Sequence, residues 1–483
     1  MQSLGLVYDA LLANPLTSGP LAFTVVPDLA VAVPVPTEGG KSFAFRLRPG
    51  RTYTYSDGRP VRASDFRRAI ERLFRIGSDW SSDYRGIVGA AACTRTRCDL
   101  RRGIVTDDRA GTVVFHLTAP DRNFLTDLTY LASAPVPAGI PLRDAGDSIP
   151  GTGPYRFASS NNGRTIYVRN PRFHEWSHAA QPDGSPDEIV MRYGMGYAQE
   201  ARAVERDQAD WTSDPIPPAL LAELKIRFAS QLHYRLMTDT DFLELNTTIP
   251  PFDDVRVRQA LNFAIDRGAI VQAYGGRSVA TPTCQILPPG ILGFHRYCPY
   301  TVDPRPDGRW HAPNLALAKQ LIRASGTRGD EITVWGVTED PLPDVIRDVA
   351  AVLRRLGFRA RARFVRAAFP DSLYSTMQIR YAGDADTTPD GFFGWWFLCN
   401  STANHHWFCD PRLDAQIARA EAVEAADPRA ADGLWARIDR ALVDRATWVP
   451  LVNPHWADLV STHVHDYESF PNLGLIADQV TLR

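Results

Sequence analysis

The stretch FLELNTTIPPFDDVRVRQALNFAIDR, residues 242–267, decides the fold. It begins as a short apolar strand and breaks at Pro250-Pro251, because proline can neither donate to a strand ladder nor continue a helix. Asp253 or Asp254 can cap the helix that follows. Apolar residues then recur at spacings of three and four up to Val271, which predicts one helix with a single buried stripe.

Three further local features are predicted around helices. On the solvent side of the same helix, Asp254 and Arg258 stand four residues apart and are expected to pair. Ser64 is the expected N-cap of a helix over 65–74. The segment LGLVYDALLA, residues 4–13, places its leucines on one side and predicts another helix.

Further along the chain, the pattern becomes strand, helix, strand. Alternating or apolar runs predict strands over 332–337 and 358–365, and a helical pattern lies between them. This order predicts a parallel pair joined by a right-handed crossover, as in an α/β layer. Residues 410–446 are expected to be mostly helical.

Composition excludes several classes of protein. The 483 residues are too many for one core, so two or three domains are expected. A net charge of −2 provides no field to hold nucleic acid or anionic lipid. All basic residues but Lys41, Lys225 and Lys319 are arginine, which indicates a high-GC, actinobacteria-like genome. The sequence contains no apolar run long enough to predict a transmembrane helix.

The cysteines indicate an oxidising compartment. They fall into three pairs of near neighbours, and neighbour pairing predicts the disulfides Cys93–Cys98, Cys284–Cys298 and Cys399–Cys409. Six separate buried thiols are the alternative. Disulfides persist outside the cytosol, so we expect an extracytoplasmic location, at the cell surface or in the periplasm. The sequence opens without a secretory signal, and the expectation is that the signal and a first strand are missing from it.

Several blocks of sequence occur in one characteristic order. They are FAFRLRPG with SDGRPVRASDF, then GTGPY at 151–155, DEIVMR at 187–192, PPFDD-x-RVRQAL-x-x-AIDR at 250–267, and WVPLVN at 448–453. Together they resemble the peptide/nickel-type, family 5 solute-binding proteins of bacterial ABC importers. The resemblance implies an α/β, two-lobe periplasmic-binding-protein-like fold of class II, in the large cluster with an extra subdomain in lobe one.

The same resemblance implies domain limits and a function. Lobe one is expected over 1–241, with an inserted subdomain at roughly 30–150, lobe two over 242–450, and a return to lobe one over 451–483. Such a protein is a monomer that closes by hinge motion on an oligopeptide or peptide-like solute. It passes that solute to the permease subunits of an ABC transporter, and it needs no cofactor.

Ligand-binding residues are also implied by the resemblance. Members that bind peptides carry an aspartate in a turn of lobe two, which pairs with the α-amino group of the ligand. Asp386 matches this aspartate. Trp395 and Trp396 follow it and are expected to supply the apolar wall of the site, and Arg380 is assigned to the same site. The family's tryptophan three residues before the aspartate is replaced here by Gly383, which departs from an ordinary peptide site. As the alternative, Asp386 is a plain turn residue and both tryptophans belong to the core.

Other functions remain as alternatives. A nickel or metal-chelate binder, an oligosaccharide binder, and a solute-sensing domain derived from a regulator fusion share the same resemblance. A hydrolase would need a nucleophile–base pair, and the sequence shows none of the usual motifs for one. His405 and His406 lie between Cys399 and Cys409, but this spacing favours a disulfide-closed loop over a zinc site. No metal site is therefore predicted.

Overall fold

The computed structural model describes residues 4–18, 20–49, 53–121, 123–142, 149–339, 341–366, 369, 371–471 and 473–483. The chain forms two compact units. Unit 1 comprises Met1–Gly196 with Ser461–Arg483, and unit 2 comprises Tyr197–Val460. Both units mix helices with sheets. Among the helices of the described ranges, none combines the length and the apolar composition that a membrane crossing needs.

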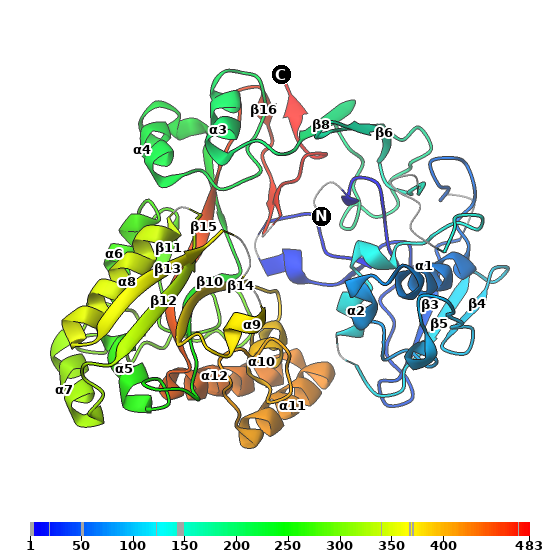
Figure 1. Ribbon diagram of the computed structural model, residues 1–483. Coiled ribbons are helices and arrows are strands. Elements are labelled where there is room, and N and C mark those ends of the chain that lie inside the picture. Colours follow the sequence, from blue (N-terminus) through cyan, green and yellow to red (C-terminus); the bar gives the residue numbers. More distant parts are fainter. Residues whose placement is uncertain are drawn as a thin grey trace. The chain divides into compact units, whose positions relative to one another are not determined.

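Unit 2 is built around a seven-stranded mixed sheet (Figure 1). The strand order is β11-β15-β10-β14-β12-β13, and β9 pairs with the other part of β15. β12 runs parallel to β13, and α8 connects them, so the predicted strand–helix–strand unit is confirmed. The strands are β9 (Leu232–Leu236), β10 (Asp239–Leu245), β11 (Ala280–Pro282), β12 (Glu331–Val337), β13 (Arg359–Val365), β14 (Ile379–Ala385) and β15 (Trp448–Leu459).

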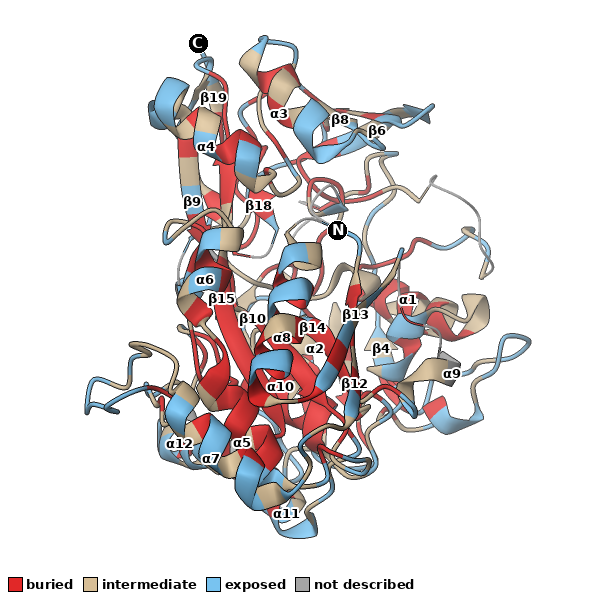
Figure 2. Cartoon of the chain, turned by 60° about the vertical axis from the view of Figure 1, so that its left-hand side comes forward, coloured by how far each residue is buried: buried red, intermediate tan, exposed pale blue. Residues whose placement is uncertain are grey.

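Helices cover both faces of this sheet, because strand residues alternate between two apolar cores. Leu243 and Ile379 pack in a core with α5, α6 and α8, whereas Phe242 and Trp448 pack under α10, α11 and α12. Figure 2 shows the central strands β10, β14 and β15 buried between them. The helices of unit 2 are α3 (Tyr197–Glu205), α4 (Pro218–Arg227), α5 (Val255–Ala264), α6 (Arg267–Ala273), α7 (Leu315–Ser325), α8 (Leu342–Leu356), α9 (Asp371–Tyr374), α10 (Pro389–Phe397), α11 (Pro411–Ala426) and α12 (Pro428–Arg445).

The stretch that decides the fold forms β10 and two helices, where the sequence predicts one. Asp254 caps α5 by accepting a hydrogen bond from the Arg256 amide at 2.8 Å. The chain then leaves the helix at Ile265, and Asp266 caps α6. The predicted single helix is therefore wrong, because a second capping aspartate stops and restarts it.

The predicted pair between Asp254 and Arg258 is also wrong. Asp254 pairs with Arg256 instead, at 2.5 Å. Arg258 is buried and donates hydrogen bonds to the carbonyl oxygens of Phe252 and Arg445. A spacing of four residues places two side chains on neighbouring positions, but these carbonyl groups offer the guanidinium several acceptors inside the protein.

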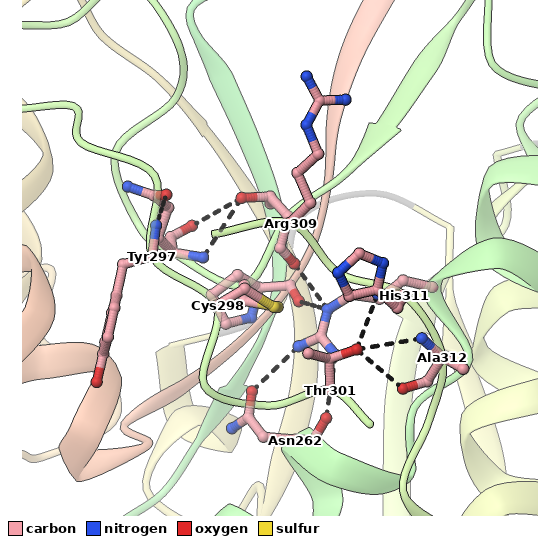
Figure 3. Close-up of a disulfide and its surroundings, with 12 residues drawn as sticks. Asn262, Tyr297, Cys298, Thr301, Arg309, His311 and Ala312 are labelled. Atoms are coloured by element: carbon pink, nitrogen blue, oxygen red, sulfur yellow. Dashed lines mark hydrogen bonds between the residues drawn. A yellow bond between two sulfur atoms is a disulfide. The ribbon is translucent and has the colours of Figure 1, made fainter. Parts of the chain in front are cut away.

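Another arginine of this stretch is wholly internal. Arg267 Nε donates to the carbonyl oxygens of Thr283 and Pro450, at 2.7 and 2.8 Å. Its other nitrogens donate to Asn262. Burial lowers the pKa of Arg267 to about 9. Figure 3 shows the neighbouring disulfide at Cys298 in a region held by such polar contacts. This arginine therefore ties α6 to β15, which lies far away in the sequence.

Unit 1 contains several small antiparallel sheets. Its largest core gathers α1 with the sheet β3-β5-β4 around Phe43, Phe66 and Phe115. A second sheet has the order β6-β7-β8. The elements are β1 (Leu12–Ala13), β2 (Val26–Pro27), β3 (Ser42–Arg46), α1 (Ala63–Ile76), β4 (Ile104–Asp107), β5 (Thr112–His116), α2 (Phe124–Asp127), β6 (Tyr155–Asn161), β7 (Arg164–Arg169), β8 (Glu188–Arg192), β16 (Val464–His465), β17 (Ser469–Phe470), β18 (Gly474–Leu475) and β19 (Thr481–Leu482).

Two helix predictions in unit 1 need correction. The described part of the segment 4–13 forms a single turn and then β1, not a helix. Its backbone carbonyl groups bind distant segments instead of forming helical hydrogen bonds. The carbonyl oxygen of Val7 accepts from Gly153 N, and that of Leu11 accepts from Asp28 N. α1 begins one residue before Ser64, and its N-cap is Arg62 with Asp65 completing a capping box.

The three predicted disulfides are confirmed. Each joins near neighbours, and the described residues contain no free cysteine. The bonds are Cys93–Cys98 in unit 1, and Cys284–Cys298 and Cys399–Cys409 in unit 2.

The limits of the compact units differ from the predicted lobe limits. Unit 2 begins at Tyr197, although lobe one was expected to extend to residue 241, and it ends at Val460, although lobe two was expected to end at residue 450. β9 explains part of this difference, since it pairs with the later half of β15 and joins the same unit. The lobe limits of 241 and 450 stay a prediction about which segments move together.

Candidate functional site

The predicted ligand residues lie on β14, on the turn after it and on α10. β14 pairs with β10 on one side and with β12 on the other. Asp386 follows the last residue of the strand, and its amide donates to the Thr238 carbonyl oxygen at 3.2 Å. A residue just beyond a strand end is held by the sheet but is free of its ladder, which is a common position for binding residues.

The Asp386 carboxylate is engaged in its own turn. Its Oδ1 accepts from Thr387 N at 2.6 Å, from Thr388 N at 2.9 Å and from Thr388 Oγ1 at 3.1 Å. All three hydrogen bonds end on Oδ1. The residue is half-buried, and burial is the main cause that raises its pKa. Asp386 therefore does stabilise a turn, as the alternative interpretation of this residue expects.

The turn leads directly into α10. Thr388 caps this helix by accepting from Gly391 N at 3.1 Å, and Pro389 occupies its first turn. A Cβ on Gly391 would lie 1.8 Å from the carboxyl carbon of Asp386. Glycine at this position is therefore what lets a carboxylate rest against the first turn of α10, where the helix dipole favours negative charge.

The two tryptophans of α10 have different surroundings. Trp395 is 57% exposed. Trp396 is buried, with its ring edge-on to Phe242 and to Trp448 at centroid distances of 5.5 Å. The two side chains cannot form one aromatic wall, because consecutive helical residues point about 100° apart. Trp395 can contact a solute, whereas Trp396 has the position of a core residue.

Arg380 is buried on β14 and pairs with Glu244 of β10, directly across the strand pair. The exposed fractions of the two side chains are 9% and 2%. The guanidinium carbon also lies over the Tyr374 ring at 4.9 Å and over the Trp396 ring at 5.9 Å. Charge pairing and cation–π contacts together fix this arginine inside unit 2.

His406 completes this buried group. Its Nδ1 lies 3.1 Å from Glu244 Oε1, and its side chain is fully buried. The carbonyl oxygen of His406 accepts from Thr247 N and from Thr247 Oγ1. Neither Glu244 nor His406 was predicted as part of the site. Pairing of β10 with β14 brings Glu244 opposite Arg380, and the turn region that contains His406 brings this histidine to Glu244. Both contacts join residues that are distant in the sequence.

Three more carboxylates missed by the sequence prediction lie near the same ends of β10 and β14. Asp239 and Asp241 are two residues apart on β10, and Asp384 lies on β14. Tyr274 donates to Asp241 Oδ2 at 2.6 Å and contacts the Tyr381 hydroxyl at 2.8 Å. Burial raises the pKa of Asp241 to about 6 and that of Asp384 to about 7. Closely spaced aspartates at both strand ends, DTDF and GDAD, are the signal that marks them.

These carboxylates do not form a metal centre. Within the described ranges, no group of three or more histidine, cysteine or acidic side chains has the spacing to hold a metal ion. His405 and His406 diverge: the His405 ring stacks on Tyr374 at 3.8 Å, whereas His406 faces Glu244. The arrangement provides negative charge, one exposed aromatic side chain and one internal ion pair.

Comparisons with known proteins identify the class. The family model described as bacterial extracellular solute-binding proteins, family 5, matches residues 24–404. A probable di/tripeptide-binding protein 5 of Pseudomonas aeruginosa is 27% identical over 480 residues, covering 93% of this chain and 85% of the relative. The glutathione-binding protein GsiB of Salmonella typhimurium is 25% identical over 405 residues, covering 77% of this chain and 72% of the relative.

Solved structures show the same fold. The clavulanic acid biosynthesis oligopeptide binding protein 2 has a TM-score of 0.86 at 21% identity, covering all of this chain and 91% of that protein. The unliganded open form of the murein tripeptide binding protein MppA has a TM-score of 0.78 at 19% identity, covering all of this chain and 93% of that protein. The two-lobe periplasmic-binding-protein-like fold implied by the sequence is confirmed.

Proposed function

Because the chain belongs to family 5 of the bacterial extracellular solute-binding proteins, we propose that it captures a small peptide or peptide-like solute for an ABC importer. The family match over residues 24–404 carries this proposal. Two relatives are named for binding di/tripeptides and glutathione, which are short peptides with a charged amine and carboxylate. The members of this family are binding proteins and not enzymes.

Capture proceeds by hinge closure of two lobes around the solute. Such closure buries the ligand, so that a few charges and backbone groups fix its orientation. The protein acts as a monomer outside the cytoplasm and docks on permease subunits. The disulfides support this location, because they persist in oxidising compartments.

Asp386 binds a cationic group of the solute, most simply an amine. Its Oδ1 is occupied by the turn, and none of the described residues donates a hydrogen bond to Oδ2. A carboxylate that is half-buried and is fixed by three hydrogen bonds is already oriented before the ligand arrives, which reduces the entropy cost of binding. Trp395 provides the apolar contact, and Arg380 supports the site from inside the sheet.

Native mass spectrometry of the purified protein, followed by titration calorimetry, tests this function. Tri-alanine, a dialanine peptide and glutathione are the ligands to titrate. We expect a bound mass of peptide size and saturable binding of at least one of the three. A bound oligosaccharide or nickel chelate would replace the peptide proposal by the corresponding alternative. A lack of binding heat with every peptide would contradict the peptide proposal. A sensing role would appear as solute binding in a protein whose native chain continues into a regulator.

A further inference from the structure

The disulfide loop, defined as residues 399–409, is attached to α10 beside its exposed tryptophan. The hydroxyl of Ser401 donates a hydrogen bond to the carbonyl oxygen of Trp395. Asn404 Nδ2 donates to the carbonyl oxygen of Leu398, just before the loop, at 3.1 Å and to that of Phe408 at 2.6 Å. The disulfide joins the two ends. The loop is therefore a compact element that is held to the C-terminal end of α10.

The same loop reaches Arg380 by two routes. His406 binds Glu244 Oε1, and the other oxygen of Glu244 pairs with Arg380. His405 stacks on the Tyr374 ring at 3.8 Å, and this ring lies 4.9 Å from the Arg380 guanidinium carbon. Both routes end on one guanidinium group. The loop thus restricts the charge partner of Arg380 and the aromatic ring beneath it.

Opening the loop removes these restraints together. A closed loop of this length has lost chain entropy that an open one regains, so its contacts are made less often once the bond is broken. Glu244 and Arg380 are buried, and a buried ion pair that loses a supporting hydrogen bond tends to rearrange toward water. Rearrangement would move β14 and α10, and with them Asp386, which lies in the turn between these two elements, and Trp395 on α10.

We propose that His406 and the disulfide loop are positioning elements of the ligand site, so that reduction of Cys399–Cys409 lowers ligand affinity. This inference rests on the proposed function, because Trp395 and Asp386 are assigned to the ligand only there. Reduction transfers two electrons and two protons from a dithiol, which becomes a disulfide, and leaves two cysteine thiols in the protein.

A pair of double variants tests the role of the bond. Cys399→Ser with Cys409→Ser opens the loop, and Cys93→Ser with Cys98→Ser opens a shorter disulfide loop in unit 1 as a control. Calorimetry with tri-alanine, well below the melting temperature of each protein, should show affinity about tenfold weaker for the first pair, equal to about 1.4 kcal/mol, and unchanged for the second. Treatment of the unaltered protein with a dithiol should reproduce the first result.

Two substitutions at one position separate positioning from general destabilisation. His406→Asn keeps an N–H group that can reach Glu244, whereas His406→Leu removes it. We expect His406→Asn to retain most of the affinity and His406→Leu to lose about as much as the opened loop. If both variants lose affinity equally, or neither does, the positioning role is overturned.

Hydrogen exchange of the ligand-free protein gives a measurement that does not depend on the ligand. Amides of β14 and α10 should exchange faster in His406→Leu and in the opened-loop variant, and at the normal rate in the unit 1 control. If the unaltered protein binds no peptide, the affinity claim falls with the proposed function, and the exchange rates still decide whether the loop orders β14 and α10. Unchanged exchange there would refute the inference.

Discussion

Asp9 and Asp28 in unit 1 and Glu244 in unit 2 are all buried acids, but their neighbours differ. Asp9 accepts from Thr152 Oγ1 at 2.5 Å, and Asp28 accepts from Trp176 Nε1 at 2.8 Å. Within the described ranges, no arginine or lysine forms an ion pair with either carboxylate. Burial raises the pKa of both, that of Asp28 to about 6. These two acids are therefore neutralised most easily by a proton.

Glu244, in contrast, lies beside an arginine of the protein. Arg380 pairs with one oxygen and His406 approaches the other. A guanidinium keeps its charge at any ordinary pH, so it can hold a carboxylate in the interior without protonation. The buried acids of this chain therefore differ in whether an arginine lies beside the carboxylate. The carboxylate of Asp386 differs from both, because we propose that its cationic partner belongs to the ligand.

The largest expected effect comes from breaking the ion pair in unit 2. Glu244→Leu leaves Arg380 buried without its carboxylate, so the free energy of unfolding of unit 2 should fall by about 3–5 kcal/mol. Urea denaturation followed by tryptophan fluorescence measures this loss. Glu244→Leu combined with Arg380→Met should restore most of it, because no charge is then unpaired. An equal loss in the double variant would mean that packing, not charge, makes the pair important.

The next effect concerns the ligand's cation. Asp386→Asn keeps the shape of the side chain and removes its charge, so affinity for the identified solute should fall by about 2–5 kcal/mol. Titration calorimetry measures the change, and Asp253→Asn, at an exposed position of unit 2, is the control. Unchanged affinity in Asp386→Asn would leave this residue as a turn residue and would favour a neutral or anionic solute.

A smaller effect follows from the acids of unit 1. The pKa of Asp28 is higher in the folded state than in the unfolded state, so folding favours its protonated form. Its contribution to stability is greatest below about pH 4 and is lost as the pH rises through 6, by about 3 kcal/mol in total. Thermal unfolding between pH 4 and pH 7 measures this trend.

Asp9→Asn removes one of the two ionisable groups, so the stability of unit 1 should depend less on pH. The oxygen that accepts from Thr152 can be kept by the amide, and the other carboxylate oxygen of Asp9 has no hydrogen-bond partner among the described residues. Asp57→Asn is the control, because the pKa of this surface acid is lowered. If the pH dependence of stability is identical in Asp9→Asn and in the unaltered protein, then Asp9 does not contribute to it.

The smallest effect lies at the surface. Asp254 both caps α5 and pairs with Arg256. Asp254→Ala should lower stability by about 1 kcal/mol, whereas Asp254→Ser keeps an oxygen for the cap and should cost little. Urea denaturation of both variants distinguishes the two contributions. Equal losses would show that the surface ion pair, and not the cap, is what matters.

The sequence predicts repeated local patterns well. The strand–helix–strand order of β12, α8 and β13 follows from hydrophobic periodicity, and the three disulfides follow from the spacing of cysteines. Failures occur where distant segments compete for the backbone. The residues before β1 have a helical pattern, but Val7 and Leu11 give their carbonyl oxygens to partners far along the chain.

The candidate site could be predicted only in part, for the same reason. The resemblance placed Asp386 in its turn, and the structure shows a turn there that leads into α10. It could not show that Trp396 packs against Phe242, or that Arg380 faces Glu244 across a strand pair. Those contacts depend on register between strands, which a short motif does not contain. Whether Asp386, Arg380, Trp395 and Trp396 bind ligand stays a prediction.

The place of β15 in the sheet also has a consequence for the order of events during synthesis. β15 lies between β11 and β10 and also pairs with β9, yet it is made after every other strand of unit 2. When β14 has been synthesised, the sheet therefore still lacks an inner strand, the one that joins β11 and β9 to β10. Unit 1 likewise takes its last segment from Ser461–Arg483. Neither unit can therefore complete its native sheet and core until the chain is nearly complete, so most of the folding of both units follows the synthesis of the last segments.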